Sequence, residues 1–262
     1  MRASPHKEVI NIMRIQAARN EVAPLIWNSR QLARVPTIGL HRLIRPGARV
    51  VVIAPHPGDE VHCCGGLLQL LATLEHPLLL ISITDGSALY PGSTLWPSSR
   101  LSVVCPQESA EALRRLGLEL HRLKWIRGGF RHGALEQQEQ PLSQFLRRYL
   151  RSGDVVLTTW REDGIADHDS VGRAAAQACA ASGATLLEIP VHAWFRPLRD
   201  EGLLPWHRAR KIRLDTWGIA RKLHAAHAYH SHLQGDPELG LPPVLVPALL
   251  ERARQPFEIV FI

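Results

Sequence analysis

The segment Val50-Val-Val-Ile-Ala54 decides the fold, and Pro55-His-Pro-Gly-Asp-Glu60 follows it directly. All five residues of the first segment are apolar and four of them are β-branched, which is typical of a strand buried on both faces of a sheet. The strand should end before Pro55, because proline cannot donate a backbone hydrogen bond to a neighbouring strand. The sequence therefore predicts a central strand with a polar loop at its carboxyl end.

Helical and extended patterns alternate after this strand. Strands are predicted at 78–83, 121–126, 155–159 and 185–190. Helices are predicted between and around them, at 66–74, 107–116, 142–150 and 170–181. Such alternation implies right-handed crossovers and a parallel sheet with helices on its faces, which is an α/β fold. A further helix is predicted at 214–233, and the apolar stretch 257–262 is expected at an edge of the sheet.

The part of the chain before the first strand has a different pattern. Apolar residues between positions 8 and 34 recur at roughly helical spacing. We therefore predict an N-terminal helical extension over 1–47 and one α/β domain over 48–262. A chain of 262 residues requires no further division.

The composition argues against several classes of protein. Four cysteines, two of them the adjacent Cys63 and Cys64, do not form the evenly spaced framework of a disulfide-rich secreted domain. No segment approaches the ~18 apolar residues of a membrane span, and the N-terminus lacks the apolar run of a signal peptide. The net charge is +7, but the arginines are scattered, so nucleic-acid binding is the least favoured function. We expect a soluble, cytoplasmic protein.

Histidine and carboxylate residues follow two of the predicted strands. His56 and Asp59 come after the strand at 50–54, and His168 comes after the strand at 155–159. Ligands of parallel sheets bind at the carboxyl ends of the strands, so these side chains should share one crevice. Each residue alone could instead form a hydrogen bond with a backbone group at the end of a strand, or cap a helix. Together, two imidazoles and one carboxylate predict a Zn²⁺ site with a position left for water.

The segment 52–60, with Gly65 and Gly66, resembles the Pro-His-Pro-Asp-Asp-Glu signature of the LmbE-like (PIG-L) deacetylases. Segments 108–117, 163–168 and 222–232 resemble later motifs of the same family, in the same order. The resemblance implies a Rossmann-like sheet and a Zn²⁺ held by His56, Asp59 and His168. It also implies a metal-dependent N-deacetylase, whose substrate would be an N-acetylated amino sugar or sugar conjugate.

Four polar positions of the family pattern are changed in this chain. The signature aspartate, to which the resemblance gives the general-base role, is Gly58, and the loop histidine that assists the leaving amine is Ile165. An arginine of the pattern is Cys105, and a late glutamine is His232. Loss of a positioned general base costs a factor of about 10² to 10⁴ in rate. The alternative function is therefore a catalytically impaired family member that binds a metal or a ligand.

Three carboxylates could replace the missing base. We select Asp167, beside His168, as the catalytic candidate, with Asp163 and Glu60 as alternatives. Each also has a structural interpretation. Asp167 would orient a neighbouring side chain through a hydrogen bond, and Asp163 would shape its loop. The negative charge of Glu60 would interact favourably with the positive end of the next helix.

Other side chains have weaker signals. His224, His227, His230 and His232 fall on one predicted helix, where a second metal site is an option but a solvated face is favoured. For Cys63 and Cys64 we expect packing. Trp160, which directly precedes the second loop, is the tryptophan that we expect nearest the substrate.

Overall fold

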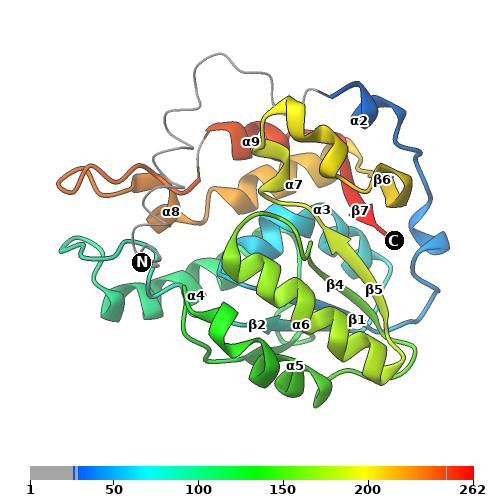
Figure 1. Ribbon diagram of the computed structural model, residues 1–262, viewed down its shortest axis with the longest axis horizontal. Coiled ribbons are helices and arrows are strands. Elements are labelled where there is room, and N and C mark those ends of the chain that lie inside the picture. The colour runs from blue at the N-terminus through cyan, green and yellow to red at the C-terminus, as the bar shows by residue number, and fades with distance from the viewer. Residues whose placement is uncertain (1–25, 27–28, 246) are drawn as a thin grey trace.

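A computed structural model describes residue 26, residues 29–245 and residues 247–262 (Figure 1). Most of the helix predicted within 8–34 lies outside these residues. The short helix α2 (Arg30–Arg34) is the described part of it, and Ser29 caps its start by accepting a hydrogen bond from the Gln31 backbone N–H. No helix in the described part of the chain is long and apolar enough to cross a membrane.

A mixed, mostly parallel sheet organises the described residues. Its strands are β1 (Val50–Ala54), β2 (Leu78–Ser82), β3 (Lys124–Arg127), β4 (Val155–Thr159), β5 (Thr185–Ile189), β6 (Ala209–Arg213) and β7 (Phe257–Phe261). The strand order is β3-β2-β1-β4-β5-β7-β6. The first five strands in this order are parallel, while β7 runs antiparallel to β5 and β6. The predicted Rossmann-like architecture is confirmed.

Helices cover both faces of the sheet (Figure 1). They are α3 (Asp59–Thr73), α4 (Ser98–Arg115), α5 (Glu139–Arg147), α6 (Ala166–Ser182), α7 (Thr216–Ala226), α8 (His230–Gln234) and α9 (Pro247–Ala253). Alternate residues of β1 serve the two faces, as the two-residue period of a strand requires. Val50 and Val52 pack with α3, α4 and α7, whereas Val51 and Ile53 pack with α5 and α6.

Two sequence predictions about the C-terminal part are wrong. The helix predicted over 214–233 is broken, because the chain turns between α7 and α8 and buries Tyr229 completely. The stretch at 257–262 is not at an edge, since β7 lies between β5 and β6. The edge strand at this end of the sheet is β6, whose sequence Ala-Arg-Lys-Ile-Arg is charged and gives no apolar strand signal.

A buried ion pair joins β7 to the helices near the site. Glu258 accepts hydrogen bonds from the backbone N–H groups of Gly66 and Leu67, both at 2.8 Å, and its Oε1 lies 2.7 Å from the Lys222 Nζ. A Cβ at position 66 would lie 2.5 Å from a methyl carbon of Leu214 and 3.1 Å from Glu258 Oε1, so a larger residue would push both side chains away. The pair therefore fixes how α3, α7 and β7 pack together.

Glu258→Gln should lower the free energy of unfolding by about 3 to 5 kcal/mol, because it leaves the Lys222 ammonium buried without a countercharge. Denaturant unfolding measures this loss. Glu251→Gln is the matched control, since its partner Arg254 is exposed and such pairs contribute about 0 to 1 kcal/mol. Equal stability of the two variants would refute a structural role for the buried pair.

Candidate metal centre

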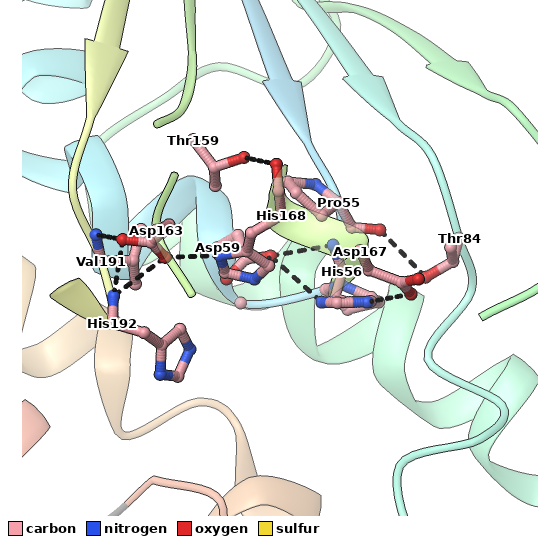
Figure 2. A network of polar contacts seen from close by, with 12 residues as sticks. Pro55, His56, Asp59, Thr84, Thr159, Asp163, Asp167, His168, Val191 and His192 are labelled. Carbon is pink, nitrogen blue, oxygen red and sulfur yellow. Dashed lines mark hydrogen bonds and ion pairs between the residues drawn. The ribbon is translucent and has the colours of Figure 1, made fainter. Parts of the chain in front are cut away.

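The three predicted ligands meet at the carboxyl ends of β1 and β4, which are neighbours in the sheet (Figure 2). His56 lies in the turn after β1, Asp59 is the first residue of α3, and His168 lies in the first turn of α6. Their ligand atoms all lie within 4.8 Å of one another. Two segments more than 100 residues apart therefore place three ligand-type side chains in one crevice.

Asp59 lies between the two imidazoles. Its Oδ2 is 3.4 Å from His56 Nδ1 and 3.2 Å from His168 Nε2, and it also accepts a hydrogen bond of 2.9 Å from the His56 backbone N–H. Zn²⁺ binds imidazole nitrogen and carboxylate oxygen at about 2.0 to 2.2 Å, so one ion can contact atoms that lie this close together. The donor set fits a zinc site with three protein ligands.

The second nitrogen of each imidazole contacts a different carboxylate. His56 Nε2 is 2.9 Å from Asp167 Oδ2, and His168 Nδ1 is 3.0 Å from Asp163 Oδ2 (Figure 2). Metal-binding histidines usually donate their other N–H to a carboxylate in this way, which fixes the ring and its tautomer. The arrangement leaves His56 Nδ1 and His168 Nε2 to face Asp59.

Asp163 is only 1% exposed, and the backbone holds its carboxylate in place. It accepts hydrogen bonds from the backbone N–H groups of Val191, His192 and Ala193, at 2.8 to 3.0 Å. These groups belong to the chain that follows β5. The loops after β4 and β5 are therefore joined through the carboxylate that orients His168.

The charges of these groups depend on one another. Burial opposes the charged form of His168, but Asp59 and Asp163 outweigh burial and raise its pKa to about 10. Burial also raises the pKa of Asp163, yet the hydrogen bond with His168 outweighs it and lowers this pKa to about 2. Negative charge is thus concentrated around two imidazoles, an arrangement that attracts a cation.

The carboxylates of all three candidate bases accept hydrogen bonds. Asp167 accepts from His56 and from the backbone N–H groups of Gly133 and Leu135, at 2.7 and 3.1 Å. Glu60 accepts from the Tyr229 hydroxyl at 2.7 Å and from the Gly58 backbone N–H at 3.0 Å. These contacts favour structural roles for Asp167, Asp163 and Glu60, and the base role of Asp167 stays a prediction.

Two further expectations are corrected. Trp160 is only 2% exposed and packs edge-on against Phe261, so it belongs to the core and does not face a substrate. His224, His227 and His230 are exposed, but His232 is buried, because α8 begins a new helix and turns this side chain inward. Cys63 and Cys64 are buried, and burial raises the pKa of both thiols, as expected for packing residues.

Three histidines that surround the site belong to none of the motifs singled out in the sequence. His132 stacks on His56 with ring centroids 4.2 Å apart, and His192 packs edge-on against His168 at 5.0 Å. His62 lies on α3, three residues after Asp59. His132 and His192 follow β3 and β5, so the rule that strand ends carry function, applied to every strand, would have found them.

A cavity of about 250 Å³ adjoins Pro57, next to the candidate ligand His56. It lies at the carboxyl ends of β2 and β3 and against α4. Polar and aromatic side chains line it, among them Ser82, Thr84, Asp85, Ser109, Trp125 and Arg127. The Arg127 guanidinium lies 5.5 Å from the centre of the Trp125 ring system.

Fold and site together define an α/β protein with a candidate metal centre at the carboxyl edge of a mostly parallel sheet. Residues 51–179 match the family model of the GlcNAc-PI de-N-acetylases, PIG-L. The chain therefore carries a PIG-L (LmbE-like) domain, which contains all three candidate ligands. No curated protein matches this sequence.

Several solved structures share the fold. N,N'-diacetylchitobiose deacetylase from Pyrococcus horikoshii has 19% identity and a TM-score of 0.55, with coverage of 72% of this chain and 73% of that one. The A40926 pseudoaglycone deacetylase Dbv21 has 20% identity and a TM-score of 0.57, with coverage of 82% and 96%. The conserved protein TT1542 from Thermus thermophilus has 23% identity and a TM-score of 0.53, with coverage of 78% and 84%.

Asp163→Asn should weaken zinc binding by about 10- to 100-fold, because the amide cannot hold His168 as the carboxylate does. Competition with a zinc-binding dye measures the dissociation constant. Glu162→Gln, an exposed change in the same loop, is the control and should bind zinc as the unaltered chain does. Unchanged affinity in Asp163→Asn would contradict the proposed contact between Asp163 and a metal ligand.

Proposed function

We propose that this protein is a zinc-dependent hydrolase that removes acetyl from an N-acetylated amino sugar or sugar conjugate. One observation carries the proposal: His56, Asp59 and His168 converge, and a separate carboxylate supports each imidazole. The PIG-L domain and the deacetylases that share its fold support the same reaction. The cytoplasmic location stays a prediction.

The protein's own residues would organise the site. When bound, Zn²⁺ polarises a carbonyl group and lowers the pKa of water to about 7. His56, Asp59 and His168 would hold the ion, while Asp163 and Asp167 hold the two imidazoles in the tautomers that ligation needs. Because all of these carboxylates are buried, the ligands need little rearrangement to bind the ion.

The cavity beside Pro57 suits the remainder of such a substrate. Trp125 offers an aromatic surface for a sugar ring, and Asp85 and Arg127 offer hydrogen bonds to hydroxyl groups. The backbone bond from Ser87 is the one hydrogen bond that Asp85 accepts within the described part of the chain. Its remaining acceptor capacity is thus open to a ligand.

A catalytically impaired family member is the second candidate. Gly58 and Ile165 favour it, since neither residue can transfer a proton. Such a protein would still bind zinc, because its three candidate ligands are present. Turnover therefore distinguishes the two functions, whereas metal content does not.

The purified protein should contain about one equivalent of zinc and release acetate from a panel of N-acetylglucosamine conjugates. His168→Ala should lose both properties, and a chelator should abolish acetate release until zinc is restored. His224→Ala, an exposed change on α7, is the control. Bound zinc without turnover on any conjugate would favour the impaired family member.

Asp167→Asn separates the two roles considered for Asp167. If Asp167 orients His56, the variant should bind zinc about 10- to 100-fold more weakly but keep most of its kcat at saturating zinc. If Asp167 is the general base, kcat should fall by about 10² to 10⁴ even at saturating zinc. The hydrogen bonds of Asp167 lead us to expect the first result.

A further inference from the structure

Arg252 is a buried cation that is held by backbone groups. It lies in the last turn of α9 and is only 7% exposed. Its Nη2 donates to the Pro190 carbonyl at 2.8 Å, and its Nη1 donates to the Val191 carbonyl at 3.3 Å. Within the described part of the chain it forms no ion pair with a carboxylate. A buried guanidinium costs free energy unless charges and hydrogen bonds compensate for the lost water, so a negative charge is expected close by.

Two consecutive peptide units connect Arg252 to the carboxylate of Asp163. In the first unit, the Pro190 carbonyl accepts from Arg252. The Val191 N–H of the same unit donates to Asp163 Oδ1 at 2.8 Å. In the second unit, the Val191 carbonyl accepts from Arg252. The His192 N–H of that unit donates to both oxygens of Asp163, at 3.0 and 2.9 Å (Figure 2). Both peptide bonds are trans, so the C=O and N–H groups of each unit point in opposite directions. Each unit therefore contacts the cation on one side and the anion on the other.

The charges of Arg252 and Asp163 stabilise the same orientation of these peptide units. A peptide unit has a dipole of about 3.5 D, with its negative end at the carbonyl oxygen and its positive end at the N–H. The cation lies at the negative ends and the anion at the positive ends. Hydrogen bonds in such a chain polarise one another in the protein interior. Burial lowers the pKa of Arg252, and the negative charge of Asp163 is among those that oppose this change.

Trp194 holds the same carbonyl group of Pro190. Its indole N–H donates to the Pro190 oxygen at 2.8 Å, and the Arg252 guanidinium carbon lies 5.9 Å from the centre of the Trp194 ring system. A carbonyl oxygen has two lone pairs, so Trp194 and Arg252 together use both. Trp194 is completely buried. The peptide unit is therefore fixed from its carbonyl side, with the Val191 N–H directed at Asp163.

We propose that Arg252 is a positioning residue of the metal centre. It holds the chain after β5, this chain holds the carboxylate of Asp163, and Asp163 Oδ2 lies 3.0 Å from His168 Nδ1. The proposal rests on the zinc site and the deacetylase function proposed above. Because Arg252 forms no hydrogen bond to a candidate ligand within the described chain, we expect it to change zinc affinity and not the reaction itself. The other interpretation is that Arg252 only attaches α9 to the sheet.

Arg252→Gln removes the positive charge and the forked donor but keeps an amide that can reach one carbonyl group. We expect the zinc dissociation constant to rise by about 3- to 30-fold, with kcat at saturating zinc close to that of the unaltered chain. Competition with a zinc-binding dye, well below the melting temperature, measures the constant. Arg252→Lys keeps the charge without the planar fork, so its loss should be smaller. Arg254→Gln, an exposed change just after α9, is the matched control and should bind zinc as the unaltered chain does.

A double-mutant cycle separates positioning from simple attachment of α9. If Arg252 acts through Asp163, Arg252→Gln should weaken zinc binding little further in a chain that already carries Asp163→Asn. If Arg252 only attaches α9, the two losses should multiply. Multiplying losses, or an unchanged dissociation constant in Arg252→Gln, would overturn the proposal and leave the zinc site and the deacetylase function intact. If Arg252→Gln does not fold, the same cycle with Arg252→Lys decides. An unaltered protein that binds no zinc would refute the zinc site and the proposal together.

Discussion

The hydrogen bond between Asp163 and His168 is the interaction on which the rest of the site depends. A carboxylate that is almost completely buried costs free energy unless hydrogen bonds compensate for the lost water. Three backbone N–H groups after β5 and the imidazole of His168 supply this compensation. One side chain therefore joins two loops of the sheet and fixes the ring that must face Asp59.

The sheet explains why so much of this arrangement could be predicted. β1 and β4 are apolar and adjacent, and parallel strands end at the same edge, so His56, Asp59 and His168 had to lie near one another. The edge strand β6 and the break between α7 and α8 could not be predicted in the same way. Their causes are long-range: β6 pairs with β7, and Tyr229 turns inward to bond Glu60.

The difference between features set by local sequence and features set by long-range contacts also applies within the site. The three candidate ligands stand in short motifs, whereas His62, His132 and His192 become neighbours of the site only through folding. Gly58 and His232 are departures from the family pattern that are far apart in sequence, yet a Cβ on Gly58 would lie 3.6 Å from His232 Nε2. Cys105 also lies in this region, since its Sγ and a His232 ring nitrogen are within 4.8 Å of each other. Three of the four changed positions are thus spatial neighbours, which a comparison of single motifs does not reveal.

The composition of the zinc ligand shell tests the central claim most directly. Two other clusters among the described residues also have ligand-type atoms within 4.8 Å of one another: Cys105, Glu108 and His232, which includes a thiol, and His56, His132 and Asp167, which does not include His168. X-ray absorption spectroscopy of the zinc-loaded protein identifies the thiol cluster, because zinc–sulfur distances are about 2.3 Å and zinc–nitrogen or zinc–oxygen distances are about 2.0 to 2.2 Å. His168→Ala identifies the cluster with His132, because it removes no ligand of that cluster. We predict two imidazoles, oxygen ligands and no sulfur, with the signal lost in His168→Ala. A sulfur ligand, or a spectrum that His168→Ala leaves unchanged, would contradict a centre built from His56, Asp59 and His168.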